Sequence, residues 1–303
     1  MKKPLADPRR LVHFTPLRYP GGKGKLAAYV KEIIRTNKLY DGEYVEPYAG
    51  GAAIGLELLF QEYVSKIHIN DLSAPVYSFW KSVLNDTDEL CRLVKNTRLS
   101  VASWSRQKRI FAHPRDHDYL QLGFATFFLN RTNRSGILNG GIIGGKDQSG
   151  PWKIDARYNA DELIFRIESI AKMRRRIKLT RSDALALLRF GLPKWEKKTL
   201  IYLDPPYYEQ GRKLYYDYYT PDDHSQVAKF IEAKMGNRFW IVSYDNVSPI
   251  KKLYSGFRSV VYDVGYTARE QRTGREVMFF SSNLAIPDLI GPARQIGKVR
   301  QAA

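Results

Sequence analysis

The chain has 303 residues, 44% of them hydrophobic, and 49 Lys and Arg against 31 Asp and Glu give it a formal net charge of +18. Its longest apolar stretch is well short of the roughly 18 residues of a membrane span, and no apolar segment follows the basic residues 1–10, which argues against a membrane or exported protein. The single cysteine, Cys91, excludes a disulfide framework and a cysteine metal cluster, so we expect a cytoplasmic protein without a metal site.

The positive charge is concentrated in two stretches of the chain. Lys and Arg crowd residues 172–181 and again residues 269–275, and both stretches alternate with aromatic-rich segments. An excess of this size favours a polyanion as partner, since nucleic acids are bound by basic grooves with stacking side chains. Solubility alone is the simpler explanation of a basic chain, and charge does not distinguish DNA from RNA.

The first half of the chain predicts the opening of a doubly wound α/β sheet. Residues 44–46 are typical of a buried strand, which runs into the glycine-rich turn 47–51. Helical periodicity covers residues 52–60, and a second short strand at 67–70 ends at Asp71. Strand, glycine-rich turn, helix and strand are the first units of such a sheet.

The same pattern resumes in the second half. The elements expected there are strands at 199–203, 239–243 and 277–280 and a helix at about 222–235 that is capped by Thr220 or Asp222. The first of these strands is stopped by the turn Asp204-Pro205-Pro206-Tyr207.

Between the two halves the character of the chain changes. Helices are expected at 88–96 and 119–130, whereas residues 134–152 are glycine-rich and typical of a loop. We therefore predict a smaller, mainly helical domain inserted into a mostly parallel α/β domain. The expected boundaries are 1–14 for a basic N-terminal tail, 15–77 and 160–290 for the α/β domain, 78–159 for the insertion and 291–303 for a basic C-terminal tail.

The glycine-rich turn and the end of the next strand suit an adenosine-type cofactor. Gly50 and Gly51 let the backbone approach a ligand, although tight turns also use glycine for steric reasons alone. Asp71, 21 residues after Gly50, can accept hydrogen bonds from both hydroxyls of a ribose. It can equally be a turn or cap aspartate before Ser73.

The turn at residues 204–207 suits chemistry on an amino group attached to a heteroaromatic ring. Such an amino group is a poor nucleophile, because its lone pair is delocalised into the ring. The Asp204 carboxylate and the Pro205 carbonyl can accept both amino hydrogens and turn the lone pair toward an electrophile. Tyr207 offers a face on which a flipped base can stack. An ordinary Pro-Pro turn is the simpler alternative.

In this order the motifs resemble the DNA adenine methylase (Dam-like) family of N6-adenine-specific DNA methyltransferases. The resemblance extends from Leu17 to Asn283 and is carried by Arg18-Tyr19-Pro20-Gly21-Gly22-Lys23, residues 46–51, Asp71, residues 130–132 and residues 204–207. It implies the Rossmann-like fold of S-adenosylmethionine-dependent methyltransferases, in which the inserted domain recognises the target sequence. It also implies a bacterial or phage enzyme that flips a base out of double-stranded DNA and that, in a restriction-modification system, accompanies a cognate restriction endonuclease.

The resemblance also assigns roles to individual residues. The implied cofactor-binding set is Tyr19, Lys23, Glu46, Pro47, Tyr48, Gly50, Asp71, Asp183 and Asp204, with Asp71 on the ribose and Asp183 on the adenine of S-adenosylmethionine. The implied catalytic set is Asp204, Pro205, Pro206 and Tyr207, and the implied DNA contacts are Arg131, Asn133 and Arg134. Family members commonly carry an aromatic residue and an asparagine after the Asn-Arg pair, where this chain has Asn133-Arg134-Ser135-Gly136, so the resemblance does not extend to the recognition sequence.

Two other functions are compatible with the sequence. One is N6-adenine methylation of RNA, and the other is nucleic-acid binding by a protein that has kept the fold and lost catalysis. Intact Lys23, Asp71, Asp204 and Tyr207 argue against the second. Enzymes that act on cytosine N4 tend to carry serine in place of this aspartate, so the resemblance, with aspartate at position 204, implies adenine N6 as the target. Direct transfer to an amino group requires neither a cysteine intermediate nor a metal.

Overall fold

The computed structural model describes residues 14–18, 23–209, 219–266, 272–290 and 293–302. Within these residues one eight-stranded sheet has the order β3-β2-β1-β4-β5-β7-β6-β8. The strands are β1 (Glu43–Glu46), β2 (Lys66–Asn70), β3 (Ile177–Thr180), β4 (Leu200–Leu203), β5 (Phe239–Asp245), β6 (Arg258–Tyr266), β7 (Arg272–Phe280) and β8 (Arg294–Arg300). The neighbours from β3 to β5 are parallel, and the neighbours from β5 to β8 are antiparallel.

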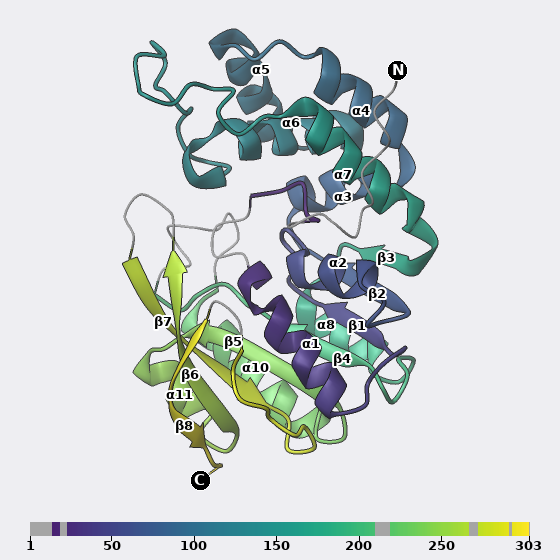
Figure 1. The fold of residues 1–303 in the computed structure, drawn as a ribbon, viewed down its shortest axis with the longest axis vertical. Helices are drawn as coiled ribbons and strands as arrows, with labels where there is room; N and C mark the ends of the chain where they lie inside the picture. The colour runs from purple at the N-terminus through teal and green to yellow at the C-terminus, as the bar shows by residue number, and fades with distance from the viewer. Residues whose placement is uncertain (1–13, 19–22, 210–218, 267–271, 291–292, 303) are drawn as a thin grey trace.

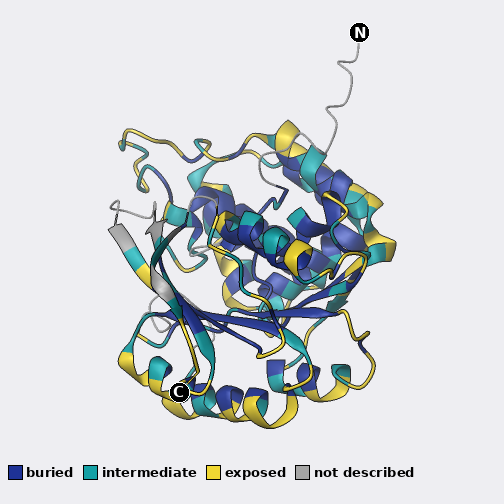
Figure 2. Cartoon of the chain, turned by 60° about the horizontal axis from the view of Figure 1, so that its bottom comes forward, coloured by how far each residue is buried: buried dark blue, intermediate teal, exposed yellow. Residues whose placement is uncertain are grey.

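The two faces of the sheet carry different helices because apolar side chains alternate along the strands. Tyr44, Leu200 and Tyr202 belong to the core on one face, and Val45 and Ile201 to the core on the other. The first face is covered by η2 (Lys23–Leu26), α1 (Ala27–Thr36) and α2 (Ala53–Phe60). The second face is covered by α8 (Ala184–Gly191), α10 (Pro221–Lys234) and α11 (Ser248–Leu253), and Figure 2 shows the buried sheet between the layers.

The remaining helices gather in a lobe at the top of Figure 1. They are α3 (Ala74–Asn85), α4 (Thr87–Asn96), α5 (Val101–Ala112), α6 (Tyr119–Thr132), η3 (Arg134–Gly136), α7 (Ala160–Lys172) and η4 (Arg174–Arg176). Helix α6 lies at the centre of the lobe and packs against α3 and α5, and every residue of α6 from Leu122 to Thr132 is buried. Helix α7 packs against α3 and α4, so the helical layer continues beyond the expected boundary at residue 159.

The strands and helices expected from periodicity are present within a few residues of their predicted bounds, although β5 and β7 are longer than expected. Thr220 is the cap of α10, since its side chain accepts from the Asp223 amide while the Asp223 carboxylate accepts from the Thr220 amide. None of the helices in the described ranges has the length and hydropathy needed to cross a membrane.

The C-terminal tail predicted for residues 291–303 is wrong for residues 294–300. These residues form strand β8, which pairs with β6 and closes the antiparallel edge of the sheet. The segment carries only two aliphatic side chains, Ile296 and Val299, and Val299 packs against the core. Its order comes from backbone pairing with β6, which a search for apolar periodicity does not detect. The expected N-terminal tail lies outside the described residues, except for Phe14, which is buried against Phe60.

Candidate functional site

Four acidic side chains lie at the carboxyl ends of four parallel strands. Glu46 ends β1, Asp71 follows β2, Asp183 follows β3 and Asp204 follows β4. Chain order reverses between β1 and β4, which are neighbours in the sheet. Ligands of open α/β sheets bind at such a reversal, beyond the carboxyl ends of the strands.

The turn after β1 is tied to the end of β2 by Asp71. Its Oδ2 accepts from the Gly50 amide at 2.9 Å, and its Oδ1 accepts from the Ser73 amide at 3.0 Å. Gly50 and Ala52 both have a positive φ of 47°, a conformation that the Asp71 bond and a bond from the Trp80 indole to the Gly50 carbonyl stabilise. Asp71 is therefore a turn aspartate, and because its side chain is partly exposed, its role toward a ribose stays a prediction.

The residue before Asp71 also organises this edge of the sheet. Asn70 is completely buried and donates from Nδ2 to the Pro47 and Ser182 carbonyls, at 2.9 Å in both cases. Its Oδ1 accepts from the Thr180 hydroxyl at 2.8 Å and from the Ser182 amide at 3.0 Å. One side chain thus joins the ends of β1, β2 and β3, which the sequence did not reveal.

Glu46 is a buried carboxyl group with one oxygen unused. Its Oε1 accepts from the Tyr44 hydroxyl at 2.9 Å and from the Gly55 amide at 3.3 Å, whereas Oε2 has no hydrogen-bond partner within the described part of the chain. Burial, assisted by the charge of Asp204, raises the pKa of Glu46 to about 8 against the opposing effect of these two bonds. A cationic group beside Oε2 would lower that pKa and supply the missing partner.

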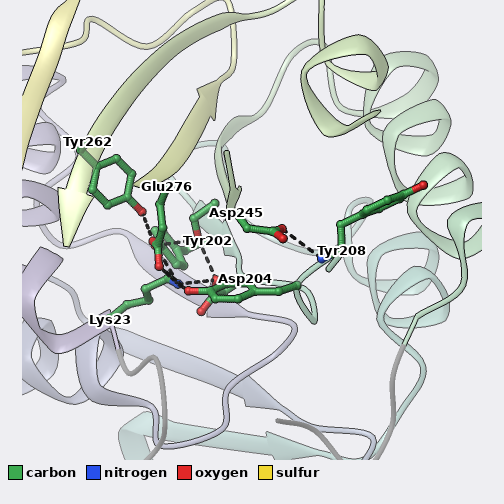
Figure 3. A network of polar contacts seen from close by, with 9 residues as sticks. Lys23, Tyr202, Asp204, Tyr208, Asp245, Tyr262 and Glu276 are labelled. Atoms are coloured by element: carbon green, nitrogen blue, oxygen red, sulfur yellow. Dashed lines mark hydrogen bonds and ion pairs between the residues drawn. The ribbon is translucent and has the colours of Figure 1, made fainter. Parts of the chain in front are cut away.

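Asp204 and Lys23 form the centre of the site (Figure 3). The Lys23 ammonium lies 3.1 Å from Asp204 Oδ1, which also accepts from the Ser243 hydroxyl at 2.8 Å. Ser243 in turn accepts from the Tyr202 hydroxyl at 3.0 Å. Burial raises the pKa of Asp204, and the charge of Lys23 opposes that rise. Lys23 stays protonated because, although burial lowers its pKa, the carboxylates around it raise the pKa well above its ordinary value.

The predicted open stacking face of Tyr207 is absent from this arrangement. The side chain is 3% exposed, and the Lys23 ammonium lies 4.6 Å from the ring centroid. The hydroxyl is 2.5 Å from Lys23 Nζ and donates to Glu276. Stacking on a flipped base would require this side chain to turn outward. Next to it, the amides of Tyr208 and Glu209 donate to Asp245, which fixes the chain after the turn.

The remaining residues of the predicted cofactor-binding set are Asp183, Tyr48 and Tyr19. Asp183 is exposed, and its carboxylate accepts from the Ala186 amide at 2.9 Å as the cap of α8, so a contact to an adenine stays a prediction. The Tyr48 hydroxyl lies 3.0 Å from that of Tyr219, which directly precedes the Thr220 cap of α10. Tyr19 lies outside the described residues.

Two of the three side chains expected to contact DNA are buried. Arg131 is 8% exposed, and its Nε donates to the Pro16 carbonyl at 2.6 Å. Asn133 is completely buried, accepts from the Trp104 indole at 2.6 Å and donates to the carbonyls of residues 137 and 138. Both side chains hold the lobe together instead of facing a ligand. Arg134 is exposed, and its contact with DNA stays a prediction.

The basic stretch at 172–181 also divides into structural and exposed residues. Arg176 pairs with Glu62 and donates to the carbonyls of Val64 and Ser65, whereas Lys172, Arg174, Arg175 and Lys178 are exposed. Among the described residues there is no group of three or more His, Cys, Asp or Glu that could hold a metal ion.

A family model described as D12 class N6 adenine-specific DNA methyltransferase matches residues 19–267, which is most of the chain. The chain belongs to this family. It is a methyltransferase that modifies adenine in DNA, so the predicted family and reaction are confirmed. This settles the polymer in favour of DNA over RNA and an enzyme over an inactive binding protein.

The methyltransferase is also similar to individual proteins. It is 24% identical over 264 residues to the Type II methyltransferase M.MjaIII of Methanocaldococcus jannaschii, with 80% of this chain and 88% of that protein covered. Among solved structures, the rRNA methyltransferase aviRa from Streptomyces viridochromogenes is 13% identical with a TM-score of 0.36, covering 93% of this chain and 95% of that one. A Legionella pneumophila protein is 13% identical with a TM-score of 0.33, covering 87% of each chain. The fold assignment therefore rests on the strand order of the methyltransferase itself.

Proposed function

We propose that the methyl donor of this methyltransferase is S-adenosylmethionine and that the carboxyl ends of β1, β2 and β4 hold it. The residues fit such a molecule. Glu46 Oε2 is buried without a partner and suits a cationic group, and Asp71 is a partly exposed carboxylate that suits a ribose. When bound there, S-adenosylmethionine supplies a methyl group that is already activated on a sulfonium.

The residues around Asp204 act on the target amino group. The Ser243 hydrogen bond and the close approach of the Lys23 ammonium both involve Oδ1 of Asp204, so Oδ2, which accepts no hydrogen bond from the described residues, can accept from adenine N6. Accepting this hydrogen localises the nitrogen lone pair and aims it at the methyl group. The charge of Lys23 opposes the rise in the pKa of Asp204 that burial causes, and so favours the ionised carboxylate. The arrangement at Asp204 is the observation that carries the proposal.

The substrate of this reaction is proposed to be duplex DNA from which the adenine is flipped, because the amino group in a base-paired adenine cannot reach a buried carboxylate. In Figure 1, the glycine-rich segment 134–152 of the lobe lies on the same side of the molecule as the upper ends of β6 and β7. Arg134, the first residue of that segment, is exposed. Since DNA is the substrate, we propose an intracellular location.

The methylated nucleoside that the protein forms in DNA tests the proposed reaction. Duplex DNA treated with the protein and S-adenosylmethionine is expected to contain N6-methyladenine on nucleoside mass spectrometry, and Asp204→Ala is expected to abolish it while DNA binding persists. Asp88→Asn, an exposed acidic position on α4, is the matched control and is expected to retain activity. N4-methylcytosine as the main product, or full activity of Asp204→Ala, would contradict the proposal.

Cofactor binding has a separate test. Asp71→Ala is expected to weaken S-adenosylmethionine binding by ~2–3 kcal/mol, the usual value for hydrogen bonds to a charged group. Asp88→Ala, at an exposed position of α4 outside the implied cofactor-binding set, is the matched control and should leave the affinity unchanged. Titration calorimetry on the folded variants measures both, and unchanged affinity in Asp71→Ala removes Asp71 from the site.

A cognate restriction endonuclease is the last part of the proposal, because M.MjaIII is named a Type II methyltransferase. Sequencing of treated plasmid DNA gives the methylated sequence. An endonuclease from the same host that cuts this sequence only when it is unmethylated is the expected partner, and a host without such an activity excludes the pairing.

A further inference from the structure

Glu276 is a buried carboxylate that reaches the site from the antiparallel part of the sheet. It lies on β7 opposite Tyr262 of β6 and Asp245 of β5, and it is 1% exposed. Its oxygens lie 3.3 Å from Lys23 Nζ, and Oε2 accepts from the Tyr262 hydroxyl at 2.5 Å. Burying a charged carboxylate is costly unless it is paired, so the donors around Glu276 both compensate its charge and fix its position.

The contacts of Glu276 converge on the groups that the reaction uses. Figure 3 shows Lys23 between the carboxylates of Glu276 and Asp204. The same carboxylate accepts from the Tyr207 hydroxyl, which is also bonded to Lys23. Glu276 therefore contacts Lys23, the cation paired with Asp204, and Tyr207, the last residue of the turn that Asp204 begins.

The ammonium of Lys23 has three hydrogens, and their distribution decides what Asp204 can accept. With Glu276 and Tyr207 as its hydrogen-bond partners, Lys23 approaches Asp204 at Oδ1, and Oδ2 accepts no hydrogen bond from the described residues. Without the Glu276 charge, the Lys23 ammonium would have Asp204 as its one carboxylate partner and would move toward it. An ammonium centred on the Asp204 carboxylate would compete with the amino group of the target base.

We propose that Glu276 is a positioning residue for methyl transfer, which holds the Lys23 ammonium and the Tyr207 hydroxyl so that Asp204 keeps one oxygen for the target adenine. This inference rests on the proposed role of Asp204. Glu276 lies on the antiparallel strand β7, whereas the motifs found from the sequence lie at the ends of the parallel strands.

The test is a comparison of Glu276→Gln with Glu276→Asp. The glutamine keeps the shape and removes the charge, so kcat is expected to fall by about 100-fold, the usual effect of a displaced reacting group. Binding of S-adenosylmethionine and of duplex DNA, measured by calorimetry and anisotropy, is expected to change less than about threefold, a shift below ~0.7 kcal/mol. Aspartate keeps the charge and shortens the side chain, and it is expected to restore part of kcat.

The pH profile of kcat separates positioning from a structural role. The groups that face Asp204 are Lys23 from η2, Tyr202 from its own strand, Ser243 from β5, Glu46 from β1 and Glu276 from β7. Because the Glu276 charge raises the pKa of Asp204, the acidic limb of the profile should move to lower pH in Glu276→Gln and stay in place in Glu276→Asp.

Three outcomes overturn the inference: an unchanged kcat in Glu276→Gln, an unmoved acidic limb, or a loss of activity that matches the loss of folded protein. If Glu276→Gln does not fold, Glu276→Asp alone remains decisive, since the inference requires a lower kcat with the acidic limb in place. Tyr29→Phe removes a buried hydroxyl that donates to the Pro287 carbonyl and is the control for loss of a buried hydrogen bond. Failure of the unaltered protein to methylate adenine would instead contradict the proposed function.

Discussion

The parallel and the antiparallel parts of the sheet both supply the site, but they do so in different ways. In the parallel part, Glu46, Asp71 and Asp204 each lie where an apolar strand ends. The carboxyl ends of parallel strands meet at one edge, so a position in the chain already implies a position in space. In the antiparallel part, Glu276 and Tyr262 lie inside strands and reach the site through the register of β6 and β7. Such residues are found only when the pairing is known.

The two parts meet at Lys23, so removing this cation is expected to have the largest effect. Lys23→Met leaves the carboxylates of Asp204 and Glu276 buried without the cation that they share, which typically costs ~3–5 kcal/mol of folding stability. Urea unfolding measures the loss, and methylation should be abolished. The double variant Lys23→Met/Glu276→Gln is expected to recover part of the stability but not the activity. Equal stability of the single and double variants would show that the two parts are not coupled through Lys23.

A second contrast lies within the lobe, between Asn133 and an exposed residue of the same segment. Asn133→Ala leaves the Trp104 indole and two carbonyls without their partner, and an unsatisfied buried group costs ~1–3 kcal/mol. We expect a loss of about 3 kcal/mol in the free energy of unfolding. Asn139→Ala, at an exposed position, should cost almost nothing. Similar losses in both variants would contradict the structural role of Asn133.

Glu46, in the parallel part of the sheet, is expected to make the folding stability depend on pH. Its pKa of about 8 in the folded protein exceeds the ordinary value of 4.5, so its contribution to stability is complete below about pH 4.5 and is lost as the pH rises through about 8. The protein should lose ~2 kcal/mol of folding stability between pH 5 and pH 8. This loss is smaller than the maximum that the full pKa shift of Glu46 would give. Glu46→Gln is expected to flatten this dependence in urea unfolding. S-adenosylmethionine should also reduce it, because a cation beside Oε2 lowers the pKa. A loss of the same size in Glu46→Gln would assign it to other groups.

The sequence predicted the parallel part of the fold well because its signals are local. Apolar strands followed by a glycine-rich turn or by Asp204-Pro205-Pro206-Tyr207 gave the strands, the edge and the acidic residues. The sequence did not reveal Asn70, although it directly precedes Asp71, because its four hydrogen bonds join three segments that are distant in the chain. Strand β8 was missed for the same reason, since its partner β6 lies some 30 residues earlier.

Side-chain exposure in the lobe was the least predictable property. Arg131, Asn133 and Arg134 are polar neighbours, and composition favours the same basic surface for all of them. The first two are buried by contacts distant in the chain, Arg131 against the Pro16 carbonyl and Asn133 against the Trp104 indole of α5. The basic stretch 172–181 was expected to favour a polyanion as partner, but Arg176 within it is paired with Glu62.

Arg134 provides the smallest and most specific test, because it is the only one of the three expected DNA contacts that is exposed. Arg134→Ala is expected to weaken duplex binding by ~1 kcal/mol and to reduce the salt dependence of log K by about 0.9, the value for one phosphate contact. Stability and S-adenosylmethionine binding should not change. Arg92→Ala, which removes an exposed arginine paired with Glu89 on α4, is the matched control and should leave the salt slope unchanged. Fluorescence anisotropy at several salt concentrations measures both variants.

If Arg134 instead contacts a base edge, affinity for the methylated sequence will fall while the salt slope stays the same, and relaxed sequence preference will accompany it. Unchanged affinity and unchanged preference would place the DNA outside this segment of the lobe.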